Sequence, residues 1–288
     1  MRTDCRIDLR FGRKMQMHRL SRDVLQTLQF KTRDRNGSAP LTIVFVDSSY
    51  SEVFDNWLRH ALSFVGNDLF VFSLDEAMHV KVQGRGLSSL LLNFSGALDE
   101  LWLLRLEIFE ALTDLGVSFV HSDVDAVWMS DPRAYCVGLD VDLAISAGTI
   151  WPPEALELWG FVLCCGFFSV RPSSGMKAFF EAVRHAAIVD RDDQAAVNRV
   201  LAKAAVGWQS EGLSYDVQVV MGRPFRIYHE VIFGRTRHGF DIALALLPQD
   251  LFQRIRRSCE PGFVKHPLTP KEPAAKIAAL RDFGCWRD

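Results

Sequence analysis

Two aspartates, Asp123 and Asp125, follow an apolar segment in the stretch VSFVHSDVDAVWMSDP. If the chain stays extended here, side chains two residues apart point the same way, and the two carboxylates lie together. Neighbouring carboxylates repel each other, and a divalent cation relieves that repulsion; their hard oxygens suit Mg²⁺ or Mn²⁺. The alternative is a turn in which the aspartates accept hydrogen bonds from nearby amides. The position directly after an apolar segment favours the metal site.

The apolar segment before the aspartates predicts a buried strand, and the chain around it alternates between strands and helices. Apolar runs typical of strands occupy residues 41–46, 68–74, 117–121, 141–146 and 161–170. Apolar residues at helical spacing predict helices over 51–65, 99–116, 174–188, 192–205 and 271–284. The segment 84–96, with glycine at both ends, predicts a loop. The alternation predicts an α/β fold with a Rossmann-like, mostly parallel central sheet flanked by helices. Such sheets bind ligands at the edge formed by the carboxyl ends of their strands. Asp123 and Asp125 directly follow a predicted strand and are therefore expected at this edge.

The composition excludes several other classes of protein. The chain has 288 residues, of which 49% are hydrophobic and 24% charged, so collagen-like, disordered and small disulfide-rich proteins are excluded. A net charge of −2 gives no general attraction to nucleic acid, and no apolar run is long enough for a membrane span. The basic N-terminus lacks the apolar core of a secretory signal, and the cysteines lack metal-binding spacing. We therefore expect a cytoplasmic protein with no nucleic-acid partner and no membrane span; the sequence does not predict the oligomeric state.

The order of several motifs resembles the nucleotide-diphospho-sugar transferase family, in particular the plant xylosyl-, arabinosyl- and galactosyltransferases of glycosyltransferase family 77. The resemblance extends in patches over residues 41–286. Its segments are TIVFVDSSYSEVFDNWL, FVFSLDEA, LWLLRLEIFEAL, LGVSFVHSDVDAVWMSDP with the DxD motif, CCGFFSVRPS, DDQAAVN, ALLPQDLF and FVKHPLTPKEPAAKIAALRDFGCW. It implies a GT-A-like fold, with a basic lead-in over residues 1–40 and a single glycosyltransferase domain over residues 41–288. The chain departs from the family at Arg105, where lysine is usual, and at Cys165, where serine, threonine or alanine is usual.

The resemblance also assigns roles to individual residues. It implies that Asp123, Asp125 and His266 bind Mn²⁺ or Mg²⁺, since one imidazole and two carboxylates leave positions for phosphate oxygens. It implies a nucleotide-sugar donor, UDP-linked, that contacts Val46, Asp47, Ser48, Tyr50, Arg105, Asp123 and Lys271. Tyr50 is expected to stack on uracil, or alternatively to be a buried side chain without that role. Arg105 is expected either to reach a phosphate of the donor or to lie in solvent at the surface. Lys265, Lys271 and Lys276 lie near His266 in the sequence, and one of them is expected to neutralise the leaving diphosphate. For Lys276 the default expectation is a solvated helix face.

Catalytic roles are expected for Arg105, Asp193 and Gln194, the last two through contacts with the donor sugar or the acceptor hydroxyl. For the run Asp192-Asp193-Gln194 the alternative is capping of the helix that begins there. Among the tryptophans, Trp128 is expected in the core, and Trp151 is the better candidate for an apolar platform under the acceptor.

The implied reaction moves a sugar to the hydroxyl of a glycan, protein or small molecule with retention of anomeric configuration. Two alternatives remain. DVDAV also matches the start of haloacid-dehalogenase-type phosphatases, although that class opens with this motif and here about 120 residues precede it. The other alternative is a glycan-binding scaffold without turnover, which the departures at Arg105 and Cys165 would allow.

Overall fold

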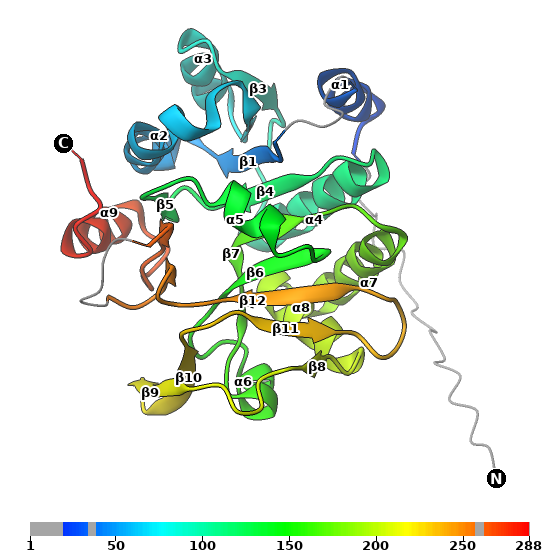
Figure 1. Ribbon diagram of the computed structural model, residues 1–288. Helices are drawn as coiled ribbons and strands as arrows, with labels where there is room; N and C mark the ends of the chain where they lie inside the picture. Colours follow the sequence, from blue (N-terminus) through cyan, green and yellow to red (C-terminus); the bar gives the residue numbers. More distant parts are fainter. Residues whose placement is uncertain (1–19, 34–38, 257–261, 288) are drawn as a thin grey trace.

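A sheet of nine strands forms the centre of the computed structural model, which describes residues 20–33, 39–256 and 262–287 (Figure 1). In the order in which they lie side by side, the strands are β3 (Ser88–Leu91), β2 (Leu69–Ser73), β1 (Leu41–Val46), β4 (Phe119–Ser122), β7 (Leu163–Val170), β6 (Leu143–Ala147), β12 (Ala243–Leu247), β11 (Ile232–Arg235) and β8 (Gly207–Trp208). All of them except β7 and β11 run in the same direction. The prediction of a mostly parallel α/β sheet is confirmed.

Helices cover both faces of this sheet. They are α1 (Arg22–Thr32), α2 (Ser51–Val65), α3 (Glu76–Gly84), α4 (Leu98–Asp114), α5 (Arg133–Gly138), α6 (Pro153–Trp159), α7 (Ser174–Asp190), α8 (Asp193–Lys203) and α9 (Pro273–Asp282). One hydrophobic core packs α4, α7 and α8 on one face, and another packs α2, α3, α5 and α9 on the other. Of the predicted basic lead-in over residues 1–40, residues 1–19 and 34–38 lie outside the described part of the chain.

Strand β1 shows why the central strands are apolar at most of their residues. Its alternate side chains enter the two cores: Leu41 and Ile43 pack with one, and Val44 and Val46 with the other. Because successive side chains of a strand point to opposite faces, a strand covered on both sides is apolar at nearly every residue.

The prediction of a loop over residues 84–96 is wrong, because β3 lies within it and pairs in parallel with β2. The strand is at the edge of the sheet, and all four of its residues are only half-buried. An edge strand of this kind, with the polar start Ser88-Ser89, has too little apolar pattern to be recognised from the sequence.

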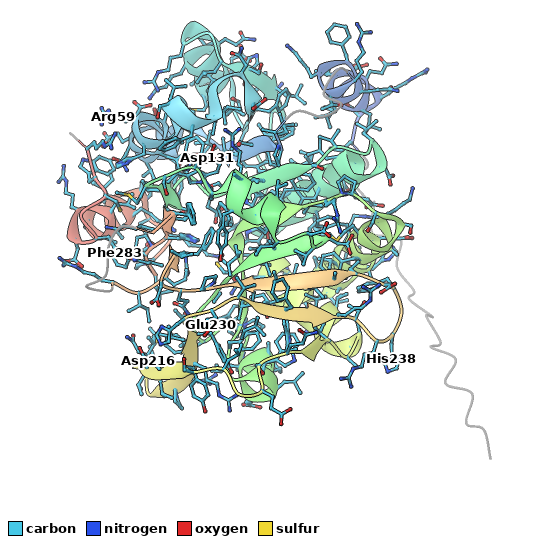
Figure 2. The ribbon with its side chains drawn as sticks, in the orientation of Figure 1. Arg59, Asp131, Asp216, Glu230, His238 and Phe283 are labelled. Carbon is cyan, nitrogen blue, oxygen red and sulfur yellow. The ribbon has the colours of Figure 1, made fainter. Side chains whose placement is uncertain are left out.

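Two smaller sheets extend the fold. Strands β13 (Phe252–Gln253), β14 (Val264–Lys265) and β5 (Val127–Trp128) form one, and the hairpin β9 (Tyr215–Val220) and β10 (Arg223–Tyr228) forms the other. Side chains fill the space between these sheets and the helices (Figure 2). Across the described residues, no helix is both long enough and apolar enough to cross a membrane.

Candidate active site

The two aspartates of the DxD motif lie in a tight turn directly after β4. The amide of Ala126 donates to the carbonyl oxygen of Asp123 at 3.0 Å, and the amide of Asp123 donates to the carbonyl of Gly166 at 2.7 Å. The prediction of an extended segment is therefore wrong, because the chain must reverse here to enter β5. The carboxylates nevertheless come together, since each of them contacts side chains of other elements rather than the amides of its own turn.

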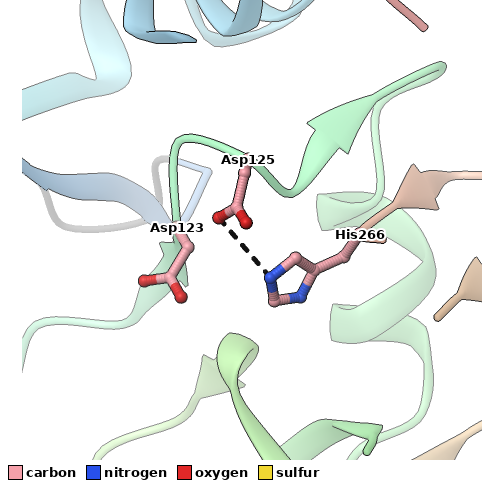
Figure 3. A group of neighbouring side chains, drawn as sticks. All are labelled: Asp123, Asp125 and His266. Carbon is pink, nitrogen blue, oxygen red and sulfur yellow. Dashed lines mark ion pairs between the residues drawn. The ribbon is translucent and has the colours of Figure 1, made fainter. Parts of the chain in front are cut away.

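His266 reaches this turn because β14 runs antiparallel to β5. Lys265 lies opposite Val127 in that ladder, so the next residue, His266, comes beside Asp125. The Nε2 atom of His266 is 3.5 Å from Oδ1 of Asp125 (Figure 3). Asp123, Asp125 and His266 each offer one potential ligand atom, and these atoms all lie within 4.8 Å of one another. Two carboxylate oxygens and an imidazole nitrogen form a donor set that suits a divalent cation such as Mn²⁺ or Mg²⁺.

Gly166 on β7 forms the floor under this cluster. A β-carbon at this position would lie 2.1 Å from Cε1 of His266 and 2.8 Å from Oδ2 of Asp123. Real β-carbons do not come that close to other atoms, so only glycine allows the imidazole and the carboxylate to meet here. This role of Gly166 is not apparent from the sequence, because it depends on the pairing of β4 with β7.

Arg105, from α4, pairs with the Asp123 carboxylate at its Oδ1 atom. Its Nη1 atom is 3.3 Å from Asp123, while Nη2 lies 3.5 Å from the carboxylate of Asp193 and 2.8 Å from Nε2 of His121. Burial alone would raise the pKa of Asp123, but the charge of Arg105 and the hydrogen bond with His121 hold it well below its usual range. Arg105 is buried, so the solvated alternative is wrong.

Lys276 pairs with the second aspartate from the opposite side of the site. Its ammonium group contacts Oδ2 of Asp125. Burial alone would raise the pKa of Asp125, yet His266 and Lys276 together lower it. The prediction that Lys276 lies on a solvated helix face is wrong, because α9 packs Leu280 into the core and thereby turns this lysine inward.

The three residues at the start of α8 have different roles: one caps the helix, and the next two face the site. Asp192 is the cap, since its Oδ1 accepts from the amide of Ala195 at 2.7 Å. The carboxylate of Asp193 is buried against Arg105, and burial raises its pKa to about 6. The Gln194 side chain accepts from the amide of Cys165 at 3.4 Å and donates to the carbonyl of Trp151 at 2.6 Å.

The residues expected at the nucleotide gather at the end of β1. Val46 is buried, Asp47 caps the short turn that follows by accepting from the amide of Tyr50 at 3.2 Å, and Ser48 donates its amide to Asp75 at 2.7 Å. The Tyr50 hydroxyl donates to the carbonyl of Lys271, which ties the segment before α9 to β1. Burial and the negative charges of Asp125 and Asp47 raise the pKa of Tyr50 to about 12, so this hydroxyl stays protonated.

Four further side chains complete the surroundings. The ammonium of Lys271 lies 4.2 Å from the centre of the Trp102 ring. Trp128 is buried in the core as predicted, whereas Trp151 is 54% exposed beside Gln194. The thiol of Cys164 is 3.9 Å from Nδ1 of His266; burial would raise its pKa, but the positive groups Arg254 and His266 lower it to about 7. Cys164 could not be recognised from the sequence, because adjacent cysteines in an apolar run are typical of ordinary core residues.

Comparison with known families assigns the chain to one of them. Residues 67–260, well over half of the chain, match the nucleotide-diphospho-sugar transferase family. The chain therefore belongs to the nucleotide-diphospho-sugar transferase family. This family assignment argues against the alternative in which the DxD motif belongs to a haloacid-dehalogenase-type phosphatase.

Solved structures and curated proteins give weaker comparisons. The apo structure of the bifunctional glycosyltransferase WbbM is 15% identical over 57% of this chain, with a TM-score of 0.38. This chain spans 37% of the WbbM chain. CMP:2-keto-3-deoxy-manno-octonic acid synthetase complexed with CTP is 11% identical over 58% of this chain and 87% of its own, with a TM-score of 0.37. The search of curated proteins found no match.

Proposed function

We propose that this protein transfers a sugar from a UDP-linked donor to an acceptor hydroxyl, with Mn²⁺ or Mg²⁺ bound by Asp123, Asp125 and His266. The observation that carries the proposal is the convergence of these three side chains from two distant segments of a chain that belongs to a nucleotide-sugar transferase family. A bound divalent cation supplies positive charge that stabilises the departing diphosphate.

Arg105 and Asp193 act in this proposal through the position of Asp123. The guanidinium lies between the carboxylates of Asp123 and Asp193, and that ion-pair chain fixes the first aspartate of the motif. Gln194 links β7 to the carbonyl of Trp151 and so orients the exposed indole that we propose as the acceptor platform. These contacts support a positioning role for Arg105, Asp193 and Gln194 near the donor sugar.

The nucleotide is proposed to lie beside Val46, Asp47, Ser48 and Tyr50, at the end of β1. Lys271 and Lys276 supply two cations for the phosphates: the ammonium of Lys271 lies over the Trp102 ring, and that of Lys276 contacts Asp125. When a diphosphate is bound, each ammonium has a stronger anionic partner available, and we assign Lys271 to the phosphates.

The transfer is proposed to retain anomeric configuration, as in the family that the motifs resemble. The acceptor oxygen forms a bond to the anomeric carbon on the face from which the diphosphate departs, and the hydroxyl proton passes to a leaving diphosphate oxygen. No protein nucleophile is needed for this step. The roles of the carboxylates in the site support a step without a protein nucleophile. Asp123 and Asp125 form part of the proposed cation site, and Asp193 is paired with Arg105.

The test is a panel of nucleotide sugars, each measured for thermal stabilisation and for donor hydrolysis with and without Mn²⁺. A UDP-sugar should stabilise the protein more than GDP-, CMP- or dTDP-sugars do, because a ligand that binds only the folded state shifts unfolding by mass action. Asp125→Ala should abolish the Mn²⁺-dependent part of both the thermal stabilisation and the donor hydrolysis. Asp140→Ala, at an exposed aspartate, is the matched control and should change neither the thermal stabilisation nor the donor hydrolysis.

Two results would contradict the proposal. Full donor turnover by Asp125→Ala would remove the metal site from the reaction. Ligand-specific stabilisation without any hydrolysis or transfer, across all donors and both ions, would instead indicate the inactive glycan-binding scaffold.

A further inference from the structure

A cavity of about 490 Å³ lies between α6, the end of α8 and β8, apart from the cluster around the DxD motif (Figure 1). Its volume is within the range of sites that hold small molecules. Its lining comprises Leu158, Trp159, Phe161, Ala202, Ala205, Val206, Gly207, Trp208, Ser210, Arg226 and Arg237. The lining contains no acidic residue, so the two arginines give the cavity a positive charge.

The cavity and the proposed catalytic cluster lie at opposite ends of helix α8. The helix begins at Asp193, beside Arg105, and Ala202 near its other end lines the cavity. At 1.5 Å per residue, that separation is roughly 14 Å along the helix axis. Asp131, close to the DxD segment, and His238, next to Arg237, are likewise well apart (Figure 2). A ligand in the cavity therefore occupies a place of its own.

Each arginine of the cavity lies over a glycine. A β-carbon at Gly160 would lie 2.9 Å from Cδ and Nε of Arg226, and one at Gly207 would lie 2.9 Å from Nη2 of Arg237. Arg226 also rests on the ring of Tyr215, at 4.9 Å. The absence of side chains at both glycines lets the guanidinium groups lie flat at the cavity. A guanidinium is always charged, and its fork of donors matches a carboxylate or phosphate.

Trp208 adds an unused donor to these charges. Its Nε1 atom is buried, and within the described part of the chain no acceptor lies in hydrogen-bond range of it. Buried indole N–H groups normally have a partner, so an oxygen atom of a ligand would satisfy this one. Trp159 packs edge-on against Trp208, with ring centres 5.9 Å apart, and both indoles line the cavity.

We propose that this cavity is a second binding site, for a sugar that carries a carboxylate or a phosphate. Arg226 and Arg237 bind the anionic group, Trp208 donates its indole N–H to a ring or hydroxyl oxygen, and Trp159 covers an apolar face of the ring. The site does not depend on the transfer reaction and binds without a metal ion.

Calorimetric titration in EDTA tests the proposal, with glucuronate, glucose 6-phosphate and glucose as probes. At least one of the two anions should bind, and glucose should bind at least tenfold more weakly. The pair of anions distinguishes a carboxylate from a phosphate ligand. The double variant Arg226→Ala/Arg237→Ala should lose at least tenfold in affinity, and Trp208→Phe, which keeps an aromatic ring but removes the donor, should lose several-fold.

Matched variants separate this site from general charge effects. Arg235→Ala removes an exposed arginine that pairs with Asp241 outside the cavity, and it should bind the anion as the unmodified protein does. Asp125→Ala should also bind normally, which excludes the DxD cluster as the place of binding. If the double variant does not fold, the single Arg237→Ala replaces it. Failure of both anions to bind, equal binding of glucose, or unchanged affinity in the arginine variants would overturn the proposal.

Discussion

Gly166 lies directly beneath His266, so close that a β-carbon on the glycine would be 2.1 Å from the imidazole Cε1 atom. Gly166→Ala should therefore displace His266 or Asp123 from the position in which they face Asp125. We expect a loss of at least tenfold in Mn²⁺ affinity, about 1.4 kcal/mol, with the fold retained. Calorimetric titration of Mn²⁺ measures this change directly.

Gly138→Ala is the control for that substitution, because no atom lies within 4 Å of a β-carbon built there. It should leave Mn²⁺ binding unchanged. Equal Mn²⁺ affinity in Gly166→Ala and the unmodified protein would show that His266 is not a ligand of the ion.

The sequence carried most of the information about the sheet but only part of that about the site. Runs such as LTIVFV predict strands because a strand buried on both faces is apolar at nearly every residue. The two aspartates were recognisable because they follow such a run, and His266 because its segment resembles a family motif. The turn at Asp123 could not be predicted, because the extended and turned conformations suit the same residues.

Contacts that depend on long-range packing were missed. Lys276 meets Asp125 across 151 positions of the chain. The helix that carries it shows only weak apolar patterning, so its inward face could not be recognised from the sequence. Gly166 owes its place to the antiparallel pairing of β4 with β7, and Cys164 lies opposite Ser146 of β6 in a second antiparallel pair. Local sequence carries no sign of these pairings within a mostly parallel sheet.

Lys276→Met should make the protein more dependent on metal for its stability. The substitution leaves the buried Asp125 carboxylate with His266 as its remaining positive partner, and breaking a buried ion pair costs about 3 kcal/mol. A divalent cation at the site replaces the missing ammonium charge. The increase in unfolding midpoint on adding Mn²⁺ should therefore be larger in the variant than in the unmodified protein.

Lys177→Met is the control, since Lys177 pairs with Asp114 at the surface and should not change the response to Mn²⁺. An identical Mn²⁺-induced shift in Lys276→Met would contradict a cation site at Asp125.

Arg105→Lys should reduce transfer while leaving the protein folded. The guanidinium reaches Asp123 and Asp193 with two different nitrogen atoms, and a single ammonium cannot reproduce that fork. We expect kcat to fall about tenfold, equivalent to about 1.4 kcal/mol in the activation free energy. Arg105→Met should go further and destabilise the fold by about 3 kcal/mol, because both carboxylates then lose their buried partner.

Steady-state kinetics and urea unfolding measure these two effects. Arg184→Lys, at the ion pair with Glu110, is the control and should be nearly neutral in both. Arg105→Met with normal activity and stability would exclude the positioning role of the ion-pair chain.

His60→Leu should remove a part of the acid sensitivity of the fold. Burial, and then the charge of Arg287, lowers the pKa of His60 to about 4, from a usual value of 6.5. Between these two pH values the unfolded chain binds a proton that the folded protein does not, so the free energy of unfolding decreases as the pH falls. From pH 7 to pH 5 this histidine should cost about 2 kcal/mol of stability, which the leucine variant would not lose.

Urea unfolding of both proteins at pH 7 and pH 5 gives this difference, since the other titrating groups are common to the two and cancel. If His60→Leu loses as much stability between pH 7 and pH 5 as the unmodified protein does, His60 is protonated in the folded state. The buried ring must then have found a partner for its charge, which the described structure does not provide: neither ring nitrogen has a hydrogen-bond partner among the described residues.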